Sequence, residues 1–559
     1  MKGSIKSLSL LFIAAMLVVS GCSSGNKGNG SEETALPGSS AQATENSSKE
    51  EPIVITTAKG SQSSIQFHAG EDYDNNSVYK AYERDLGIIL KNAFVADGQQ
   101  YTQKVRLAIS SGEIPDVFGV SINDLAKLVE ADLVMEITDL FEQYATEETK
   151  AFVTADGGYQ MDTAKFGGKL MAIPQTSDPR IPAQFLWIRK DWMDKLDLPE
   201  PKTMQDLLKI SEAFSNGDPD GNNKKDTFGF GVDNTLFQIS FGLTSFFNAY
   251  HAYPGQWIED ASGNLVYGSI QPEMKAALKQ LQAMFVNGEI DPEFGVKDFE
   301  KTMESAAANK FGIMYGPFYA GAYPLQTAAV QDGKLVQDWR VYPIVSTDDQ
   351  PAKTQLEATV VNYFVISKKA KHPEKIIEML NKYISMLDDR KGTNADYFGQ
   401  KEGASTGADY WLLNPVLSSA QDLLTQWGTK IPEALKTGDT SKLNDEQLML
   451  YGNEKKYLEG DASYWGSAHM EFSESGTLPI LNNYIKNDQL HYNKFTGAPT
   501  ETMVEKMGTL EAKLLEVFSK IIMNDASVDE FDKFVEQWKA LGGDDMTSEV
   551  NAWYVATKG

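Results

Sequence analysis

Cysteine is almost absent from this chain of 559 residues, and its single occurrence at Cys22 excludes an intrachain disulfide. Basic residues are also scarce, because 51 Lys and Arg stand against 78 Asp and Glu, which gives a formal net charge of −27. Such a balance argues against nucleic acid as a partner, since nucleic-acid binding needs a basic surface. It also argues against adhesion to an anionic membrane by charge alone.

Two familiar catalytic signatures are missing as well. The sequence has no HExxH or P-loop pattern, and its five histidines show no metal-ligand spacing. A pair of carboxylates could serve a glycosidase, but 78 acidic residues guarantee such pairs and therefore identify nothing. Beyond the N-terminus no run of eighteen apolar residues occurs, so no further segment is predicted to span a membrane.

The first 22 residues predict an export signal. Two lysines precede an apolar run from Leu8 to Val19, and small residues then precede Cys22. The stretch VVSGC, residues 18–22, resembles the lipobox of bacterial lipoproteins. This resemblance implies that residues 1–21 are removed as a signal peptide and that Cys22 carries acyl chains such as palmitate, which give stable anchoring. The alternative is an uncleaved anchor or a plain secretory signal.

A polar stretch follows the cysteine. Residues 23–51 are rich in Ser, Gly, Asn and Glu and almost without large apolar side chains. We expect residues 22–51 to form a lipidated, disordered tether and the folded body to begin near Pro52.

From Pro52 onward, short apolar runs alternate with stretches of helical spacing. Strands are expected at residues 53–58, 114–120, 185–188, 310–317 and 360–368, and helices at 78–94, 101–112, 372–387, 502–524 and 528–543. Thr203 is expected to cap a helix, because Asp206 follows at capping-box spacing. The order strand, helix, strand predicts an α/β fold with a parallel sheet.

Six segments carry a family resemblance. They are SGEIPDVF (111–118), GKLMAIP (168–174), LWIRKDWMDKLDLPEPKTMQDL (186–207), NGDPDGNNKKDTFGF (216–230), KFTGAPT (494–500) and FVEQWKALGGDDMTSEVNAWY (534–554). In number, order and spacing they resemble the family 1 extracellular solute-binding proteins of ABC importers. The similarity is greatest to the branch of large lipoproteins and alginate-oligosaccharide binders, and it covers essentially the whole mature chain.

The resemblance implies a two-lobed, periplasmic-binding-protein-like α/β fold with a ligand cleft between the lobes and a helical C-terminal region. Lobe 1 is expected to contain residues 52–175 and about 358–410, and lobe 2 residues 176–357 and about 411–559. The chain should cross between lobes near 172–182, near 353–360 and within 405–425.

The implied function is that of a monomeric, lipid-anchored receptor on the extracytoplasmic face of the cell membrane. It would capture an oligosaccharide, or another small solute, by cleft closure and deliver it to ABC permease subunits, with no catalytic residue. Two alternatives stay open: a surface carbohydrate-active enzyme such as a glycosidase or lyase, and a sensor lipoprotein.

Oxygen-bearing side chains alternate along NGDPDGNNKKDT, residues 216–227. With Asp218 as position one, the spacing follows an EF-hand-type loop, but position six is Asn223 and position twelve is Gly229, so the loop is not an EF-hand. The predicted ligands are Asp218, Asp220, Asn222, Lys224 through its carbonyl, Asp226 and Thr227. Hard oxygens favour Ca²⁺, and spacing alone fits an Asx-rich turn equally well. The resemblance implies a calcium loop with a structural role.

Sugar recognition needs flat apolar faces and polar groups for hydroxyls. We therefore expect cleft residues in irregular segments that follow strands. The candidates are Trp465, Tyr319, Phe318, Tyr464, Trp257, Gln175, Ser121, Asn123, Asn76 and Asp74, with Trp465 and Tyr319 as first choices. For each, packing or helix capping is the competing interpretation.

Overall fold

The folded chain opens with a strand that becomes the second strand of a five-stranded sheet. The computed structural model describes residues 52–62, 64–357, 360–399 and 409–558. The predicted signal peptide, Cys22 and the tether lie outside the described residues. Of the helices in the described part, none has the length and apolar character needed to cross a membrane.

The first sheet has the strand order β2-β1-β3-β16-β6. Its strands are β1 (Ile53–Gly60), β2 (Ile88–Ala96), β3 (Val117–Val120), β6 (Ile173–Pro174) and β16 (Tyr363–Ile366). β1 pairs in parallel with both β2 and β3, as the strand-helix-strand order predicts, whereas β16 is antiparallel to β3 and β6. The strands predicted at 53–58, 114–120 and 360–368 are confirmed with shifted ends.

The helix predicted at residues 78–94 is wrong in its second half. Helix α1 (Ser77–Leu86) stops at Gly87, whose φ of 66° is left-handed and whose N–H bonds back to Glu83 and Tyr82. Strand β2 follows at once. The physical reason is the glycine C-cap followed by the β-branched pair Ile88 and Ile89, which favours a strand over further helix.

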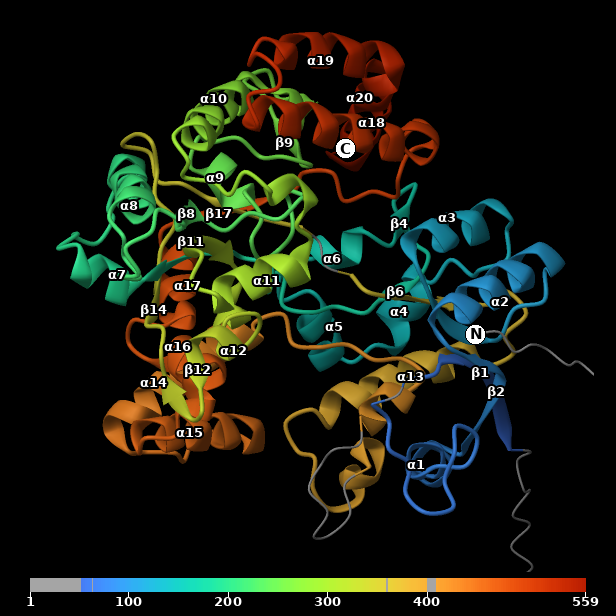
Figure 1. Cartoon of the computed structure of the whole chain (residues 1–559). Coiled ribbons are helices and arrows are strands. Elements are labelled where there is room, and N and C mark those ends of the chain that lie inside the picture. Colours follow the sequence, from blue (N-terminus) through green and yellow to red (C-terminus); the bar gives the residue numbers. More distant parts are fainter. Residues whose placement is uncertain (1–51, 63, 358–359, 400–408, 559) are drawn as a thin grey trace, which may run out of the picture. The chain divides into compact units, whose positions relative to one another are not determined.

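Six helices accompany the first sheet. They are α1, α2 (Gly98–Ser111), α3 (Ile122–Glu130), α4 (Thr138–Tyr144), α5 (Glu147–Val153) and α13 (Pro373–Ser385), with a short helix α6 (Tyr159–Asp162) and the hairpin β4 (Lys165–Phe166) and β5 (Lys169–Leu170). The helices predicted at 101–112 and 372–387 are therefore confirmed. The gold α13 lies beside the teal α4 and α5, more than 200 residues earlier in the chain (Figure 1).

The second sheet has the order β14-β7-β11-β8. Its strands are β7 (Phe185–Arg189), β8 (Phe228–Phe230), β11 (Phe311–Gly316) and β14 (Trp339–Tyr342), so the strands predicted at 185–188 and 310–317 are confirmed. β11 is parallel to β8 and antiparallel to β7. Helices α7 (Lys190–Lys195) and α8 (Met204–Asn216) follow β7, and Thr203 and Asp206 form the predicted capping box of α8.

Smaller elements complete this region. They are α9 (Thr244–Asn248), β9 (Trp257–Glu259), β10 (Leu265–Tyr267), α10 (Pro272–Val286), α11 (Phe299–Ala307), α12 (Gln326–Ala329), β12 (Val330–Gln331), β13 (Lys334–Leu335), β15 (Thr354–Leu356) and β17 (Leu490–Tyr492). β15 and β17 form a parallel pair.

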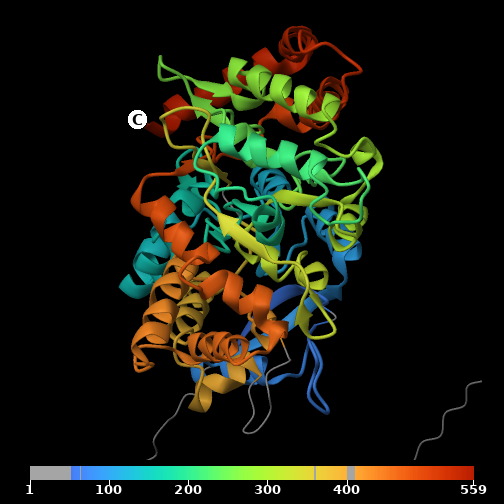
Figure 2. The same ribbon diagram turned by 60° about the vertical axis from the view of Figure 1, so that its left-hand side comes forward.

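The C-terminal part is helical, as predicted. Its helices are α14 (Leu423–Thr437), α15 (Asp445–Leu458), α16 (Met470–Phe472), α17 (Thr477–Lys486), α18 (Glu501–Ile522), α19 (Glu530–Trp538) and α20 (Asp544–Lys558). The helix predicted at 528–543 contains α19, and Gly542, with a φ of 128°, makes a kink before α20. The red helices α18 and α19 lie beside the green α10 in both views (Figures 1 and 2).

Two separate hydrophobic cores divide the folded chain. The first contains residues from Ile55 to Ile173 and from Tyr363 to Leu417, and the second contains residues from Ala183 to Leu356 and from Leu424 to Val550. We call the two parts lobe 1 and lobe 2. Residues 411–417 were expected in lobe 2, but Leu413, Val416 and Leu417 pack in the first core.

Candidate functional site

The carboxyl end of β3 opens into a cavity of about 830 Å³, which we call the first cavity. Lobe 1 lines it with α2, the end of β3, α3 and residues 361–362, and lobe 2 lines it with residues 499–505 at the start of α18. Ligands of α/β sheets commonly bind outside the carboxyl ends of parallel strands. Ser121 and Asn123, two of the predicted ligand residues, are among its lining residues.

The sequence places Ser121 there by helix capping. The Ser121 hydroxyl accepts a hydrogen bond from the Asp124 N–H at 3.2 Å and donates to the Asp124 carboxylate at 2.8 Å. Helix α3 therefore starts at the strand end and presents its first turn to the cavity. Tyr101, also in the lining, donates its hydroxyl to the Gly119 carbonyl at 2.8 Å, and burial raises its pKa.

Gln175 lies behind the lining rather than in it. Its N–H donates to the Asn362 carbonyl at 2.8 Å, and the Asn362 amide donates to the Gln175 side-chain oxygen at 2.9 Å. Asn362 lines the first cavity. Gln175 therefore fixes the orientation of a lining amide.

A cavity of about 480 Å³ lies within lobe 2, and we call it the second cavity. The middle of α18, from Gly508 to Leu515, forms one wall, and Phe237, Tyr267 and Gln355 contribute to the others. Burial raises the pKa of Glu511, which lines it, and raises that of Tyr267 to about 12. This cavity combines aromatic surface with a partly desolvated carboxyl group.

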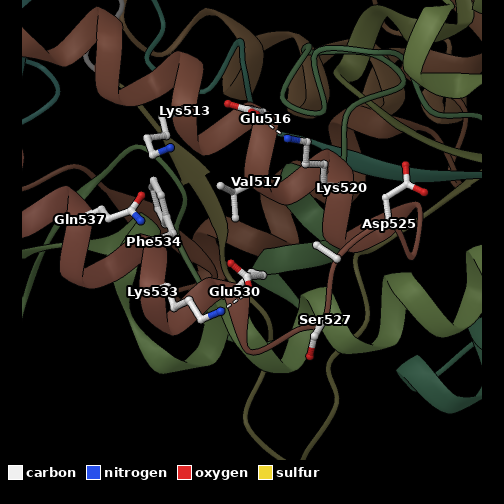
Figure 3. Close-up of a pocket in the computed structure, with 11 residues that line it drawn as sticks. Lys513, Glu516, Val517, Lys520, Asp525, Ser527, Glu530, Lys533, Phe534 and Gln537 are labelled. Atoms are coloured by element: carbon white, nitrogen blue, oxygen red, sulfur yellow. Dashed lines mark hydrogen bonds and ion pairs between the residues drawn. The ribbon is translucent and has the colours of Figure 1, made fainter.

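A third hollow, of about 460 Å³, lies between α18 and α19 (Figure 3). Its charged side chains neutralise one another, because Lys520 pairs with Glu516 at 2.5 Å and Lys533 with Glu530 at 2.5 Å. Such exposed pairs inside single helices are ordinary surface features. We therefore place the candidate site at the first two cavities.

Four of the predicted aromatic contacts gather in one place in lobe 2. Phe318 and Tyr319 open a short turn, Phe318–Gly321, which packs against the π-turn Trp465–His469. Trp465 is only 1% exposed and belongs to the second core. Lys456 lies 4.8 Å above the ring of Tyr464 and donates to its hydroxyl at 3.1 Å.

The remaining aromatic candidate is also buried. Trp257 is 3% exposed and packs against Tyr267 with 5.3 Å between ring centroids. None of the five aromatic candidates is among the described residues that line the first or second cavity. Trp465 and Trp257 are packed in the core, whereas Phe318, Tyr319 and Tyr464 are half-buried, and contact of all five with ligand stays a prediction.

The two early polar candidates make local bonds. Asn76 is fully buried and caps α1, accepting from the Tyr79 N–H at 2.9 Å. Asp74 accepts from the Asn92 amide at 2.9 Å. Neither lines the first or second cavity within the described part of the chain.

The predicted calcium loop connects α8 to β8. The Asn222 amide donates to Asp220 at 2.7 Å and to Asp226 at 3.1 Å, so three of the predicted ligands converge. One carboxylate oxygen of Asp218, Oδ1, is buried and has no hydrogen-bond partner in the described structure. The pKa of Asp220 is raised by burial and by the charges of Asp218 and Asp226. These features fit a loop that gains from a nearby cation.

Two lysines supply positive charge to the same loop. Lys310 pairs with Asp226 at 2.7 Å and lowers its pKa, and Lys195 donates to the Asp218 and Pro219 carbonyls at 3.2 and 3.0 Å.

The Thr227 hydroxyl, the last of the predicted ligands, is buried and donates to the Phe214 carbonyl at 2.8 Å, at the end of α8. Among the described residues no cluster of three or more His, Cys, Asp or Glu is arranged to hold a metal.

Sequence patterns did not indicate the part of the site that α18 contributes. The helix predicted at 502–524 is confirmed as α18, and its core stripe, with Met503, Leu510, Leu514, Phe518 and Ile521, lies in the second core. The exposed side, with Glu501, Val504 and Glu505 in the first cavity, has no motif of its own. The only available signal was the helical spacing of the α18 residues that do not belong to the core stripe.

Comparison with known proteins identifies relatives that cover most of the chain. Residues 71–386 match the model of the family described as bacterial extracellular solute-binding protein. The chain is 22% identical over 533 residues to lipoprotein LipO of Bacillus subtilis, covering 90% of this chain and 94% of LipO. It is 21% identical to the polygalacturonan/rhamnogalacturonan-binding protein YtcQ of Bacillus subtilis, covering 80% of this chain and 82% of YtcQ.

Solved structures show the same fold. FusA of Streptococcus pneumoniae in complex with kestose aligns with a TM-score of 0.55 at 16% identity, covering 90% of this chain and 99% of FusA. An EF-hand mutant of FusA with fructo-nystose gives a TM-score of 0.54 at 16% identity, with coverage of 90% and 99%. The alginate-binding protein AlgQ2 without calcium ion gives 0.54 at 16% identity, with coverage of 90% and 98%. The predicted two-lobed α/β fold is thereby confirmed.

Proposed function

The chain belongs to the bacterial extracellular solute-binding protein family, and from this premise we propose that it is a receptor that captures an oligosaccharide for an ABC importer. The observation that carries the proposal is the first cavity, which both lobes line at the carboxyl edge of the lobe 1 sheet. A ligand that touches both lobes favours the closed arrangement over the open one. The permease can then recognise the ligand-bound receptor by its closed form. Related proteins with sugar ligands, FusA with kestose and YtcQ, support a carbohydrate cargo.

The lining suits binding by hydrogen bonds and apolar contact. Ser121, Asn123 and Asn362 offer hydroxyl and amide groups, and Val361 and Val504 offer apolar surface. Sugar rings need this combination of polar and apolar contacts. Binding alone makes no demand for a nucleophile or a proton donor, so the receptor needs no catalytic residue.

A thermal-shift panel of oligosaccharides tests the receptor function, because a ligand that binds only the folded state must raise the melting temperature. We expect at least one oligosaccharide to raise it and to be recovered unchanged. Cleavage of the sugar during incubation would favour the alternative of a surface glycosidase or lyase. Failure of every sugar tested to raise the melting temperature would contradict the carbohydrate assignment.

We further propose attachment to the cell membrane through a lipidated Cys22, with the receptor acting as a monomer on the extracytoplasmic face. The lipobox-like VVSGC supports the anchor. Replacement of Cys22 by serine is expected to release the protein from the membrane fraction. Retention of the Cys22→Ser protein in that fraction would favour an uncleaved hydrophobic anchor instead.

We also propose that the loop 218–226 holds Ca²⁺ in a structural role. Asp218, Asp220, Asn222 and Asp226 with the Lys224 carbonyl would supply hard oxygen ligands. The buried, unpartnered oxygen of Asp218 and the raised pKa of Asp220 support a cation among them. Thr227 contributes through the end of α8, which its hydroxyl caps, rather than as a ligand.

A further inference from the structure

One face of α18 lines both cavities. Glu501, Val504 and Glu505 line the first cavity, and Gly508, Glu511 and Ala512 line the second. Their spacing of three or four residues places all six on one side of the helix. At 1.5 Å per residue the face runs for about 17 Å from the first to the last. The two cavities are therefore the ends of one helical surface.

This face is open where the two cavities approach each other, at Val504 of the first and Gly508 of the second. Val504 is 68% exposed. A Cβ atom added at Gly508 would meet no other atom within 4 Å. The buried side of the same helix, with Leu510 and Leu514, is held in the second core. A ligand lying along α18 would thus contact a surface that the core holds in place, and the middle of this helix face has open space for it.

The charge of the two cavities is predominantly negative. Their linings contain five acidic residues, Asp124, Glu130, Glu501, Glu505 and Glu511, and two basic ones, Arg106 and Lys127. Lys127 lies 3.9 Å from Asp124, so its positive charge is already balanced by that carboxylate. In the described part of the chain, the four glutamates form no salt bridge. The α18/α19 hollow differs, since its three lysines face three acidic residues (Figure 3).

We propose that the cargo is an uncharged oligosaccharide that lies along this face of α18 with its ends in the two cavities. The inference rests on the proposed receptor function and narrows its substrate class. Sugar hydroxyls can donate to the glutamate carboxylates, which are strong acceptors. Ring faces can pack on Val504 and Phe237. A uronate oligomer would instead bring its own carboxylates against unpaired ones, which disfavours it.

Calorimetric titration of the full chain with oligosaccharides of matched length tests the charge selection. The probes are neutral tetrasaccharides of fructose, xylose and glucose, and tetramers of galacturonate and of alginate. We expect a neutral probe to bind at least about tenfold more tightly than either uronate. Equal or tighter binding of a uronate would overturn the inference and leave the receptor function standing, whereas absence of binding by every probe would count against the receptor function itself.

Charge reversal sharpens this test. The double variant Glu501→Lys and Glu505→Lys is expected to gain affinity for galacturonate tetramers, and Glu501→Gln with Glu505→Gln serves as its uncharged control. Glu501 and Glu505 are both exposed on the helix, so both double variants should fold, and circular dichroism can verify this. No gain in uronate affinity for the lysine pair would overturn the charge argument.

A substitution at Gly508 tests the placement of the ligand. Gly508→Trp puts an indole on the wall of the second cavity, three residues along α18 from Glu505 of the first cavity. It is expected to weaken binding of the best tetrasaccharide about tenfold or more, while a disaccharide of the same sugar loses less than about twofold. Lys520→Trp, in the hollow of Figure 3, is the matched control that should bind normally. Unchanged tetrasaccharide affinity in a folded Gly508→Trp protein would overturn the placement along α18.

Discussion

His491 is a half-buried histidine in β17, where this strand pairs with β15, and the fold keeps it neutral. Its ring stacks on Tyr253 with 3.7 Å between centroids, and its Nδ1 lies 2.8 Å from the Gln256 side-chain oxygen. Burial, aided by the charges of Lys494 and Lys353, lowers its pKa from 6.5 to about 4. The residue therefore charges more readily in the unfolded chain than in the folded one.

This difference predicts an acid-sensitive window. Above pH 6.5 both states hold neutral His491, and as the pH falls from 6.5 to about 4 only the unfolded state takes up the proton. The free energy of unfolding should therefore decrease across this window, by up to about 3 kcal/mol from this residue, and level off below it. Urea denaturation from pH 7.5 to 3.5 measures the decrease. His491→Phe, which keeps the ring stacking but cannot titrate, should show a shallower slope, and an unchanged slope would assign the sensitivity to other groups.

The contact between the turns Phe318–Gly321 and Trp465–His469 depends on two glycines. A Cβ on Gly466 would lie 2.1 Å from the Gly321 carbonyl oxygen, which no small adjustment relieves. Gly466→Ala is expected to destabilise the fold by about 1–3 kcal/mol, as overpacking does. Gly452→Ala in α15 is the matched control, because a Cβ there meets nothing within 4 Å and alanine favours the helix. Thermal melts of both variants measure the change in stability. A Gly466→Ala protein as stable as the parent would mean that the two turns can separate.

The loop 218–226 gives a prediction about metal. Addition of Ca²⁺ to the chelated protein is expected to raise the free energy of unfolding by about 2–3 kcal/mol at a hundredfold excess over the dissociation constant. Asp218→Asn combined with Asp220→Asn should abolish the rise. Ligand preference should change little with chelator, since the loop lies outside both cavities. Without any calcium effect, Lys195 and Lys310 would be the loop's counterions and the acidic-turn interpretation would hold.

Sequence patterns predicted elements well where burial is one-sided and less well where the chain turns. The core stripe of α18 and the capping box at Thr203 and Asp206 follow from spacing, which local physics enforces. The end of α1 at Gly87 was missed because the apolar pattern continues through the glycine into β2.

The candidate site was predictable in part for the same reason. Ser121 and Asn123 were found because they follow a strand directly. The glutamate face of α18 lies nearly 400 residues later, and only the folded chain brings Glu501 to the same cavity. Trp465 was favoured for its aromatic ring, but a π-turn packs that ring into the core. Solvent exposure depends on tertiary packing, which residue type cannot report.

Two crossings between the separate cores lie entirely within the described residues, one between Ile173 and Ala183 and one between Leu417 and Leu424. Hydrogen bonds tie these two crossings together: Ser419 donates its N–H to the Thr176 carbonyl at 2.9 Å, and the Thr176 and Ser418 hydroxyls share a bond. Asp178 pairs with Arg180 at 2.7 Å, and Arg180 also donates to the Gln421 carbonyl. These hydrogen bonds lie at the crossings themselves, so rigid-body rotation of the lobes about the crossings is the expected response to a ligand.

Closure can be measured because the chain has a single native cysteine. In a Cys22→Ser background, Lys91→Cys on lobe 1 and Lys279→Cys on lobe 2 introduce two exposed labelling sites, one on each side of the crossings. Pulsed electron paramagnetic resonance should show a broad distance distribution without sugar, because an unliganded two-lobed receptor samples open states. A saturating oligosaccharide should shift this distance distribution and narrow it toward a single population.

A pair of labels within lobe 1, Lys91→Cys with Lys371→Cys, is the control, and its distance should not change when sugar is added. If the inter-lobe distances stay fixed while calorimetry reports binding, the ligand is held without closure, and delivery to the permease must depend on another signal.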